Sequence, residues 1–279
     1  MKTRIITGVV MAAVGIPLLW FSEYFIYPLA VSLCAFGAMF ELLRALGVHD
    51  RYLLSVPAYA IALLLPFGAY IWIKLTANPV KDYLLFAALC FVVYLLYLMF
   101  VAVLAQGEIT FSSVASTFGA AFYISCAFLS LVVLRYLSHG LACLILVFIC
   151  AWVCDMAAYF VGSMLGKHKL VERLSPKKTV EGSIGGIVVT ALVCVLYGVI
   201  LTHAFSMTAS YLLLAVCGVL LSVVSQIGDL FASLIKRERG IKDYGRIFPG
   251  HGGILDRFDS IVAVAPVLMT VCLIAPPIL

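Results

Sequence analysis

Charged side chains are scarce in this sequence, and their scarcity excludes the ordinary soluble enzyme classes. Only 11% of the 279 residues are charged, 65% are hydrophobic, and the mean hydropathy is +1.18. A soluble domain normally carries about a quarter charged residues, so this chain cannot cover itself with a polar surface. Runs of about 20 apolar residues, the length of a membrane-spanning helix, recur along the sequence. We therefore expect an integral membrane protein.

Motifs for disulfides, zinc sites and soluble nucleotide folds are also missing. The nine cysteines lie in apolar stretches and form no CxxC pair, so we interpret them as small apolar residues packed between helices. The segment GSMLGKH (162–168) lacks the spacing and the hydroxyl residue of a P-loop. The first 25 residues resemble a signal peptide without a small-x-small cleavage site, which favours an uncleaved first helix.

The apolar runs predict an all-α fold, a polytopic integral membrane helix bundle of about nine transmembrane helices. It would be a single domain, 1–279, in which residues 1–135 form less diagnostic N-terminal helices and residues 141–279 form the catalytic C-terminal helices. The predicted spans are 5–22, 24–43, 53–73, 83–104, 113–134, 141–164, 183–204, 211–235 and 259–278.

The connections between these helices differ sharply in charge. With the N-terminus in the cytoplasm, 15 of the 18 basic residues fall on the cytoplasmic side, and only Lys74, Lys81 and Arg135 fall on the other side. The positive-inside rule therefore predicts a cytoplasmic N-terminus. Eleven of the basic residues lie in two cytoplasmic stretches, 167–178 and 236–257. These stretches either attract anionic lipid head groups or bind a strongly anionic ligand.

One predicted helix has a continuous polar face. In LLSVVSQIGDLFASLIKR (220–237), the polar positions advance by four, three, four and three residues, which places them on one side of a helix. They are Ser222, Gln226, Asp229, Ser233 and Lys236. An ionisable residue inside a membrane helix costs about 2.5–3.5 kcal/mol on insertion scales and is a functional candidate by default. Such a face lines a cavity or pairs with another polar face.

A second polar group lies in AWVCDMAAYFVGSMLGK (151–167). Asp155, Tyr159, Gly162 and Gly166 share one side of the predicted helix. The two glycines permit close packing against another helix. Packing explains the glycines but does not explain the aspartate.

The third polar element is IFPGHGGILDRFDS (247–260), which runs directly into the last apolar helix. Asp256 and Asp259 are three residues apart, so their carboxylates face the same way on a helix. Two such like charges repel unless a cation lies beside them, and hard divalent cations such as magnesium prefer carboxylate oxygens. The glycines of PGHGG let backbone N–H groups approach an anion. A salt bridge from Arg257 to Asp259 or Asp243 is the structural alternative.

The fourth element is LSPKKTVEGSIGG (174–186), just before the seventh predicted helix. Ser175-Pro176 favours a helix start, and Lys177, Lys178 and Thr179 add two cations and a hydroxyl. A helix N-terminus beside lysines is a natural phosphate site. Carboxylates that hold a metal, beside cations that hold phosphates, are the parts that phosphoryl or nucleotidyl transfer requires. The residues alone therefore predict a membrane enzyme that acts on a polyphosphate.

The segment SLIKRERGIKDYGRIFPGHGGILDRFDS (233–260) resembles the signature of the phosphatidate cytidylyltransferases, also called CDP-diacylglycerol synthases. The blocks SPKKTVEGSIGG and QIGDL are similar to other blocks of that family. The signature positions are matched without a gap by Ser233, Lys236, Arg237, Lys242, Asp243, Gly245, Pro249, His251, Gly252, Gly253, Asp256, Arg257 and Asp259. The chain departs from the family at Met156-Ala157, where Thr-Gly is usual.

The resemblance implies transfer of CMP from CTP to phosphatidate, with release of pyrophosphate and with Mg²⁺ as the cofactor. Asp229, Asp256 and Asp259 are the implied metal ligands. The implied catalytic set comprises these three with Lys236, Lys242, His251 and Arg257, of which His251 would donate a hydrogen bond to phosphate. The implied substrate-binding residues are Ser175, Lys177, Lys178, Thr179, Ser233, Arg237, Asp243, Gly252, Gly253 and Asp155.

Other readings stay open at this point. A related CTP-using membrane transferase could act on another lipid phosphate or on a lipid alcohol. A transporter with a polar pathway through the sixth, eighth and ninth helices would explain the membrane carboxylates but not the dense block at 251–259. Met156-Ala157 also leaves open a catalytically inactive relative. The expected partners are CTP, phosphatidate, membrane lipids and a second copy of the chain, without nucleic acid. The expected location is the bacterial inner membrane, with the active site at the cytoplasmic face.

Overall fold

The computed structural model describes the backbone of residues 2–76 and 79–278, and the side chains of residues 7–76 and 80–278. Within this part of the chain, eight helices are long and apolar enough to cross a membrane. The first helix adds a shorter apolar stretch, Thr7–Trp20. The prediction of a polytopic helical membrane protein is therefore confirmed. The chain divides into two compact units: unit 1 comprises Met1–Val133 and Ile241–Arg257, and unit 2 comprises Leu134–Gly240 and Phe258–Leu279.

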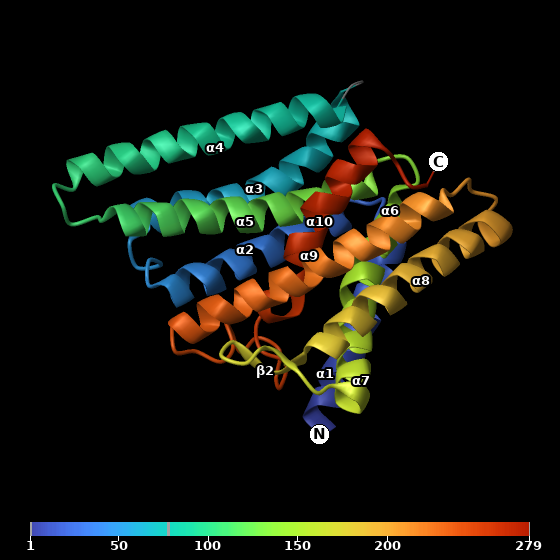
Figure 1. The fold of residues 1–279 in the computed structure, drawn as a ribbon. Coiled ribbons are helices and arrows are strands. Elements are labelled where there is room, and N and C mark those ends of the chain that lie inside the picture. The colour runs from blue at the N-terminus through green and yellow to red at the C-terminus, as the bar shows by residue number, and fades with distance from the viewer. Residues whose placement is uncertain (1, 77–78, 279) are drawn as a thin grey trace. The chain divides into compact units, whose positions relative to one another are not determined.

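Unit 1 is built from the N-terminal helices (Figure 1). These are α1 (Lys2–Trp20), α2 (Ile26–Leu46), α3 (Tyr52–Leu75), α4 (Pro79–Leu104) and α5 (Phe111–Arg135), the last of which ends just inside unit 2. Figure 1 shows α2, α3, α4 and α5 running alongside one another. Residues 241–257 are remote in sequence from these helices but belong to the same unit.

Tyrosines fasten the helices of unit 1 to one another. Tyr27 of α2 donates its hydroxyl to the carbonyl of Leu131 at 3.0 Å, and Tyr94 of α4 donates to Leu54 at 2.9 Å. A hydroxyl buried in a membrane helix needs such a partner because the lipid offers none. Phe91 of α4 adds an edge contact to Phe122 of α5. The sequence pattern predicted these helices but not which of them are neighbours. The side-chain contacts show that α2 packs against α5, and that α4 packs against α3 and α5.

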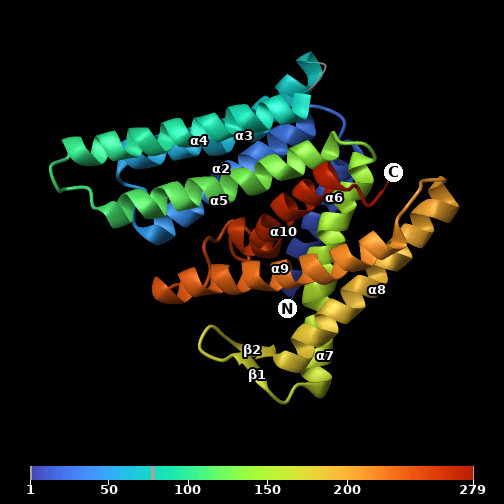
Figure 2. The same ribbon diagram turned by 45° about the horizontal axis from the view of Figure 1, so that its top comes forward.

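Unit 2 contains the C-terminal helices and one short hairpin (Figure 2). Its elements are α6 (Gly140–Phe148), the π-helix η1 (Ile149–Val153), α7 (Cys154–Leu165), β1 (Lys169–Val171), β2 (Ser175–Thr179), α8 (Val180–Phe205), α9 (Tyr211–Glu238) and most of α10 (Leu255–Ile274). The sixth predicted span is therefore α6, η1 and α7 in succession. A π-helical turn holds an extra residue and often accompanies a functional site, and here it ends at Val153, two residues before Asp155.

Small residues allow the helices of unit 2 to approach closely. A methyl group on Gly182 of α8 would lie 2.6 Å from the carbonyl oxygen of Ala158 and 3.0 Å from the Cα of Gly162, both on α7. One on Gly218 of α9 would lie 2.6 Å from the Cα of Ala191 on α8. In a membrane, where apolar side chains gain little from meeting one another, close packing of this kind drives association. The packing role predicted for Gly162 is confirmed.

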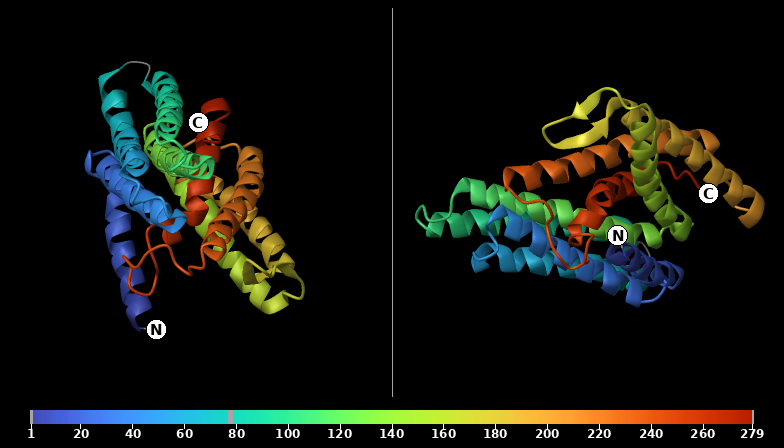
Figure 3. Two further views of the ribbon diagram at one scale, coloured as in Figure 1. Left: turned by 90° about the vertical axis from the view of Figure 1, so that its left-hand side faces the viewer. Right: turned by 90° about the horizontal axis from the view of Figure 1, so that it is seen from below.

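The predicted helix start at Ser175-Pro176 is wrong. Residues 175–179 form strand β2, which pairs with β1 in an antiparallel hairpin beside the junction of α7 and α8 (Figures 2 and 3). Helix α8 begins at Val180, because the hydroxyl of Thr179 accepts a hydrogen bond from the backbone N–H of Gly182 and so caps the helix. The carboxylate of Glu181 accepts from the N–H groups of Lys167 and His168, which ties the hairpin to the same helix end.

Candidate active site

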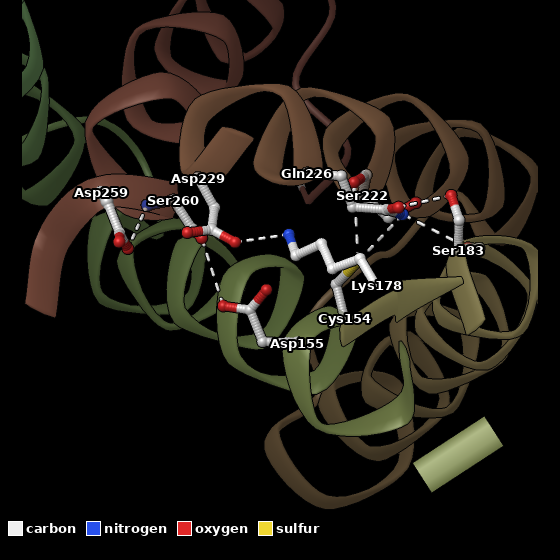
Figure 4. Close-up of polar contacts among 9 residues, drawn as sticks. All are labelled: Cys154, Asp155, Lys178, Ser183, Ser222, Gln226, Asp229, Asp259 and Ser260. Carbon is white, nitrogen blue, oxygen red and sulfur yellow. Dashed lines mark hydrogen bonds and ion pairs between the residues drawn. The ribbon is translucent and has the colours of Figure 1, made fainter. Parts of the chain in front are cut away.

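The candidate site residues fall into two groups, one in each unit. The first, here called the carboxylate cluster, consists of Asp155 on α7, Asp229 on α9 and Asp259 on α10, all in unit 2 (Figure 4). Lys178 of β2 forms an ion pair with Asp229, and each of these two side chains is 24% exposed. The hairpin therefore brings a predicted phosphate-binding lysine onto a predicted metal ligand.

The other two carboxylates are held by hydrogen bonds and charge. The hydroxyl of Ser260 donates to Asp155 at 3.2 Å, and the backbone N–H of Ser260 donates to Asp259 at 2.9 Å. Asp259 is close enough to Asp229, Asp155 and the ammonium of Lys236 for all three charges to act on it. Lys178 and Lys236 thus place two cations among the three carboxylates.

A polar network one turn along α9 supports the cluster. The hydroxyl of Ser183 on α8 donates to the amide oxygen of Gln226 at 2.5 Å. The amide nitrogen of Gln226 donates to the sulfur of Cys154 at 3.5 Å, so α7, α8 and α9 are joined through one side chain. Gln226 lies three residues before Asp229 and fixes the rotation of α9 about its axis. Sequence reasoning placed Gln226 on the polar face but did not find Ser183, whose hydroxyl gave no distinctive signal.

The oxygen-rich cluster suits a hard divalent cation. Asp229 and Asp259 offer carboxylate oxygens, the ligands that magnesium prefers. In the part of the chain that the structure describes, no three His, Cys, Asp or Glu side chains are placed to hold a metal by themselves. Magnesium commonly keeps several waters and uses substrate phosphates beside one or two carboxylates. Asp229 and Asp259 therefore fit such an ion when the remaining ligands come from water and substrate.

The second group is the signature loop, residues 241–257, in unit 1. Asp256 is buried, and its Oδ2 accepts hydrogen bonds from the backbone N–H groups of Tyr244 at 2.7 Å and Gly253 at 3.0 Å. These bonds give Asp256 a role in shaping the loop, whereas its predicted role as a metal ligand stays a prediction. Gly252 has φ +86°, a left-handed conformation that favours glycine.

The signature loop lines an open cavity of about 670 Å³. Its charged lining consists of Lys242, Arg246 and Arg257 against the single acid Asp243. His251 also lines it, and the Nδ1 atom of this ring is buried without a hydrogen-bond partner among the described residues. Because cations outnumber acids three to one, the cavity favours an anion such as phosphate.

Two residues of α2 that the sequence interpretation passed over contact this loop. Glu41 is 1% exposed and accepts hydrogen bonds from the backbone N–H groups of Ile254 at 3.0 Å and Leu255 at 2.9 Å. Arg44, one turn later, donates to the carbonyl of Tyr244 at 2.6 Å. The sequence did hold a signal for Glu41, because an ionisable residue in an apolar span is a functional candidate. It was passed over because the first four predicted helices carry no family motif.

Comparison with known proteins agrees with this chemistry. The model of a family described as the cytidylyltransferase family matches residues 2–275. The chain belongs to this family. It is similar to the phosphatidate cytidylyltransferase of Bacillus subtilis, with 36% identity over 275 residues that cover 96% of each chain. The phosphatidate cytidylyltransferase of Staphylococcus saprophyticus is 34% identical over 273 residues, covering 96% of this chain and 97% of that one. The resemblance inferred from residues 233–260 is confirmed.

In this cytidylyltransferase-family chain, the remaining predicted site residues take varied positions. Thr179 is buried and caps α8, so its hydroxyl is already used. The guanidinium of Arg237 lies 3.5 Å from the carbonyl of Leu174 in the hairpin, while Lys177 is exposed on β2. Ser175 and Ser233 are half-buried. The structure thus brings Asp155, Lys178, Asp229, Lys236 and Asp259 together in unit 2 and Lys242, His251 and Arg257 together in unit 1.

Proposed function

We propose that this protein transfers CMP from CTP to phosphatidate, yielding CDP-diacylglycerol and pyrophosphate. The carboxylate cluster carries the proposal, because three acids and two lysines in an apolar helical unit are costly unless they serve chemistry. Relatives named phosphatidate cytidylyltransferase, which align over 96% of the chain, support the choice of substrates.

The reaction needs positioning and charge neutralisation more than proton transfer. A phosphate oxygen of phosphatidate, already anionic, forms a bond to the α-phosphorus of CTP. The bond from that phosphorus to the oxygen bridging to the β-phosphate breaks, and its electron pair leaves with pyrophosphate. The two reactants are both polyanions, so the protein must supply cations that offset their repulsion.

The lysines of unit 2 can supply part of that charge. Lys178 lies at the end of a hairpin strand beside Asp229, and Lys236 lies on the same helix as Asp229. We propose that both ammonium groups hold phosphate oxygens during the reaction. Asp229 and Asp259 would hold Mg²⁺. When bound, this ion would polarise phosphate oxygens and stabilise the charge that develops on the leaving pyrophosphate.

The signature loop would contribute a second anion site. Lys242, Arg246 and Arg257 line its cavity, and guanidinium groups bind phosphate oxygens in pairs. His251 would donate a hydrogen bond to phosphate. Arg246 lies inside the signature segment 233–260, but it was not one of the site residues predicted from the sequence.

We propose that the protein resides in the bacterial inner membrane and acts at its cytoplasmic face. The asymmetry of the basic residues supports this orientation, and CTP is a cytoplasmic substrate. The relatives reported above are bacterial proteins. A homodimer stays a prediction from the family resemblance.

The experiment that tests the proposed reaction uses CTP labelled either at the α- or at the γ-phosphate. Detergent-purified protein receives phosphatidate, or a polyprenol as an alternative acceptor, with magnesium. A cytidylyltransferase moves the α-label into lipid and releases the γ-label as pyrophosphate. A CTP-dependent lipid kinase would move the γ-label into lipid and leave the α-label in CDP. Label from the γ-phosphate in lipid would therefore contradict the proposal, as would α-label transfer only to an acceptor other than phosphatidate.

A further inference from the structure

Glu41 is a buried acid in a helix that otherwise spans apolar surroundings. It lies in α2 with 1% of its surface exposed, far in sequence from every residue of the signature. An ionised carboxylate in such a place is costly unless hydrogen bonds or charges compensate it. Its position therefore requires a specific partner.

That partner is the start of α10. One carboxylate oxygen of Glu41 accepts from the N–H of Ile254, directly before the helix, and the other accepts from the N–H of Leu255, its first residue. The first N–H groups of a helix have no partner within the helix, and the helix dipole favours a negative charge there. Glu41 thus caps α10 from another helix.

The contact extends along one face of α2. Gly37, Glu41 and Arg44 are spaced by four and three residues, so they share a face. The side chain of Ile254 packs onto Gly37, where a methyl group would collide with it. Arg44 holds the carbonyl of Tyr244 at the other end of the signature loop. The glycines of the loop complete the fit, because a methyl group on Gly245 or Gly253 would overlap the carboxylate of Glu41.

These contacts fix both ends of the cavity-lining segment. Tyr244 is held by Arg44 and Asp256, and residues 253–255 are held by Glu41 and Asp256. The residues between them, 245–252, include Arg246 and His251, which line the cavity. The contacts from α2, together with those of Asp256, therefore bound the segment that carries these anion-binding groups.

We infer that Glu41 is a positioning residue for the reaction, which acts by fixing the signature loop and the start of α10 without touching substrate. The predicted effect on turnover rests on the proposed function, whereas the predicted effect on the loop structure does not. A merely stabilising role would lower the amount of folded protein and leave the turnover of each folded molecule unchanged.

The first test compares Glu41→Gln, Glu41→Asp and Glu108→Gln. Glutamine keeps the shape of Glu41 but presents an NH₂ group to one backbone donor, whereas aspartate keeps the charge and loses reach. Glu108 is an exposed acid of unit 1, so its substitution controls for loss of one negative charge. Hydrogen exchange of the amides at 253–256 is followed in the detergent-solubilised protein, together with kcat and KM for CTP.

We expect Glu41→Gln to speed exchange at Ile254 and Leu255 by about tenfold or more, since two charge-assisted hydrogen bonds are weakened. We expect kcat/KM for CTP, per folded molecule, to fall by about tenfold as well, with partial recovery in Glu41→Asp. Glu108→Gln should change neither quantity. Unchanged exchange in Glu41→Gln would overturn the cap. Faster exchange with unchanged turnover would overturn the positioning role.

A second test keeps Glu41 in place, so it remains informative when Glu41→Gln folds poorly. Gly253→Ala should speed exchange at 253–256 because its methyl group collides with the carboxylate of Glu41. Gly119→Ala in α5 is the matched control, because its added methyl group would meet no side chain of the described residues within 4 Å, and it should leave this exchange unchanged. Unchanged exchange in Gly253→Ala, or equal changes in both variants, would overturn the contact. Exchange is read without substrate, so this outcome stays separate from a failure of the proposed reaction, which would appear as wild-type protein without transfer activity.

Discussion

Replacing Lys178 with methionine probes the carboxylate cluster most directly. The substitution removes the cation that pairs with Asp229 and leaves Lys236 beside Asp259. Breaking a deeply buried ion pair costs about 3–5 kcal/mol, whereas a surface pair is worth about 0–1 kcal/mol. Each partner here is 24% exposed, so we expect a loss of about 1–3 kcal/mol. Since 1 kcal/mol shifts the Tm by roughly 2–4 °C in chains approaching this size, the Tm should fall by several degrees.

Thermal unfolding with and without magnesium then tests whether a magnesium ion binds beside Asp229 once the ammonium of Lys178 is removed. A cation that binds only the folded state at 100 times its Kd stabilises it by about 2.7 kcal/mol. Because Lys178 competes for Asp229 in the wild type, magnesium should raise the Tm of Lys178→Met by more than it raises that of the wild type. Lys177→Met, on the exposed neighbour, should leave both the Tm and the magnesium response unchanged. Equal magnesium shifts in Lys178→Met and wild type would refute the reasoning.

Two further predictions follow from single contacts. Thr179→Val removes the cap of α8 and should destabilise the protein by about 1 kcal/mol in thermal unfolding, while Thr179→Ser should not; equal Tm values for the two variants would contradict the capping role. Met156 is an exposed residue beside Asp155, so restoring the usual family pair with Met156→Thr and Ala157→Gly should change kcat/KM by no more than about twofold, or about 0.4 kcal/mol of transition-state free energy. A large gain would show that this departure limits activity.

The membrane fold and the carboxylate cluster were largely readable from the sequence. Hydrophobic runs long enough to span lipid are a strong signal, because the bilayer leaves few alternatives to a helix. The four-three spacing on α9 correctly grouped Gln226, Asp229 and Lys236, since helical periodicity holds whatever the tertiary structure. The sequence also named Asp155 and Asp259 as candidates, but it grouped Asp259 with Asp229 and Asp256, and Asp256 belongs to the loop in unit 1.

Contacts between residues far apart in the sequence could not be predicted from it. The pairing of Lys178 with Asp229 depends on a hairpin, and a lysine pair before a helix carries no sign of the strand that delivers it. Ser175-Pro176 matched a helix start, yet the stronger cap at Thr179 delayed the helix by several residues. The role of Asp256 in shaping its own loop depends on Tyr244 folding back, and the role of Glu41 depends on a contact across more than two hundred residues.

The measurement that tests the central claim most directly is CMP transfer by Asp229→Asn. The variant keeps the size of the side chain but removes the charge that meets Lys178 and that would hold magnesium. With α-labelled CTP, phosphatidate and magnesium, we predict labelled CDP-diacylglycerol from the wild type and from Asp82→Asn, an exposed acid of α4. We predict at least about a hundredfold less from Asp229→Asn, in line with loss of a charged group that acts in the transition state. Wild-type turnover in Asp229→Asn would contradict the claim that the carboxylate cluster performs the chemistry.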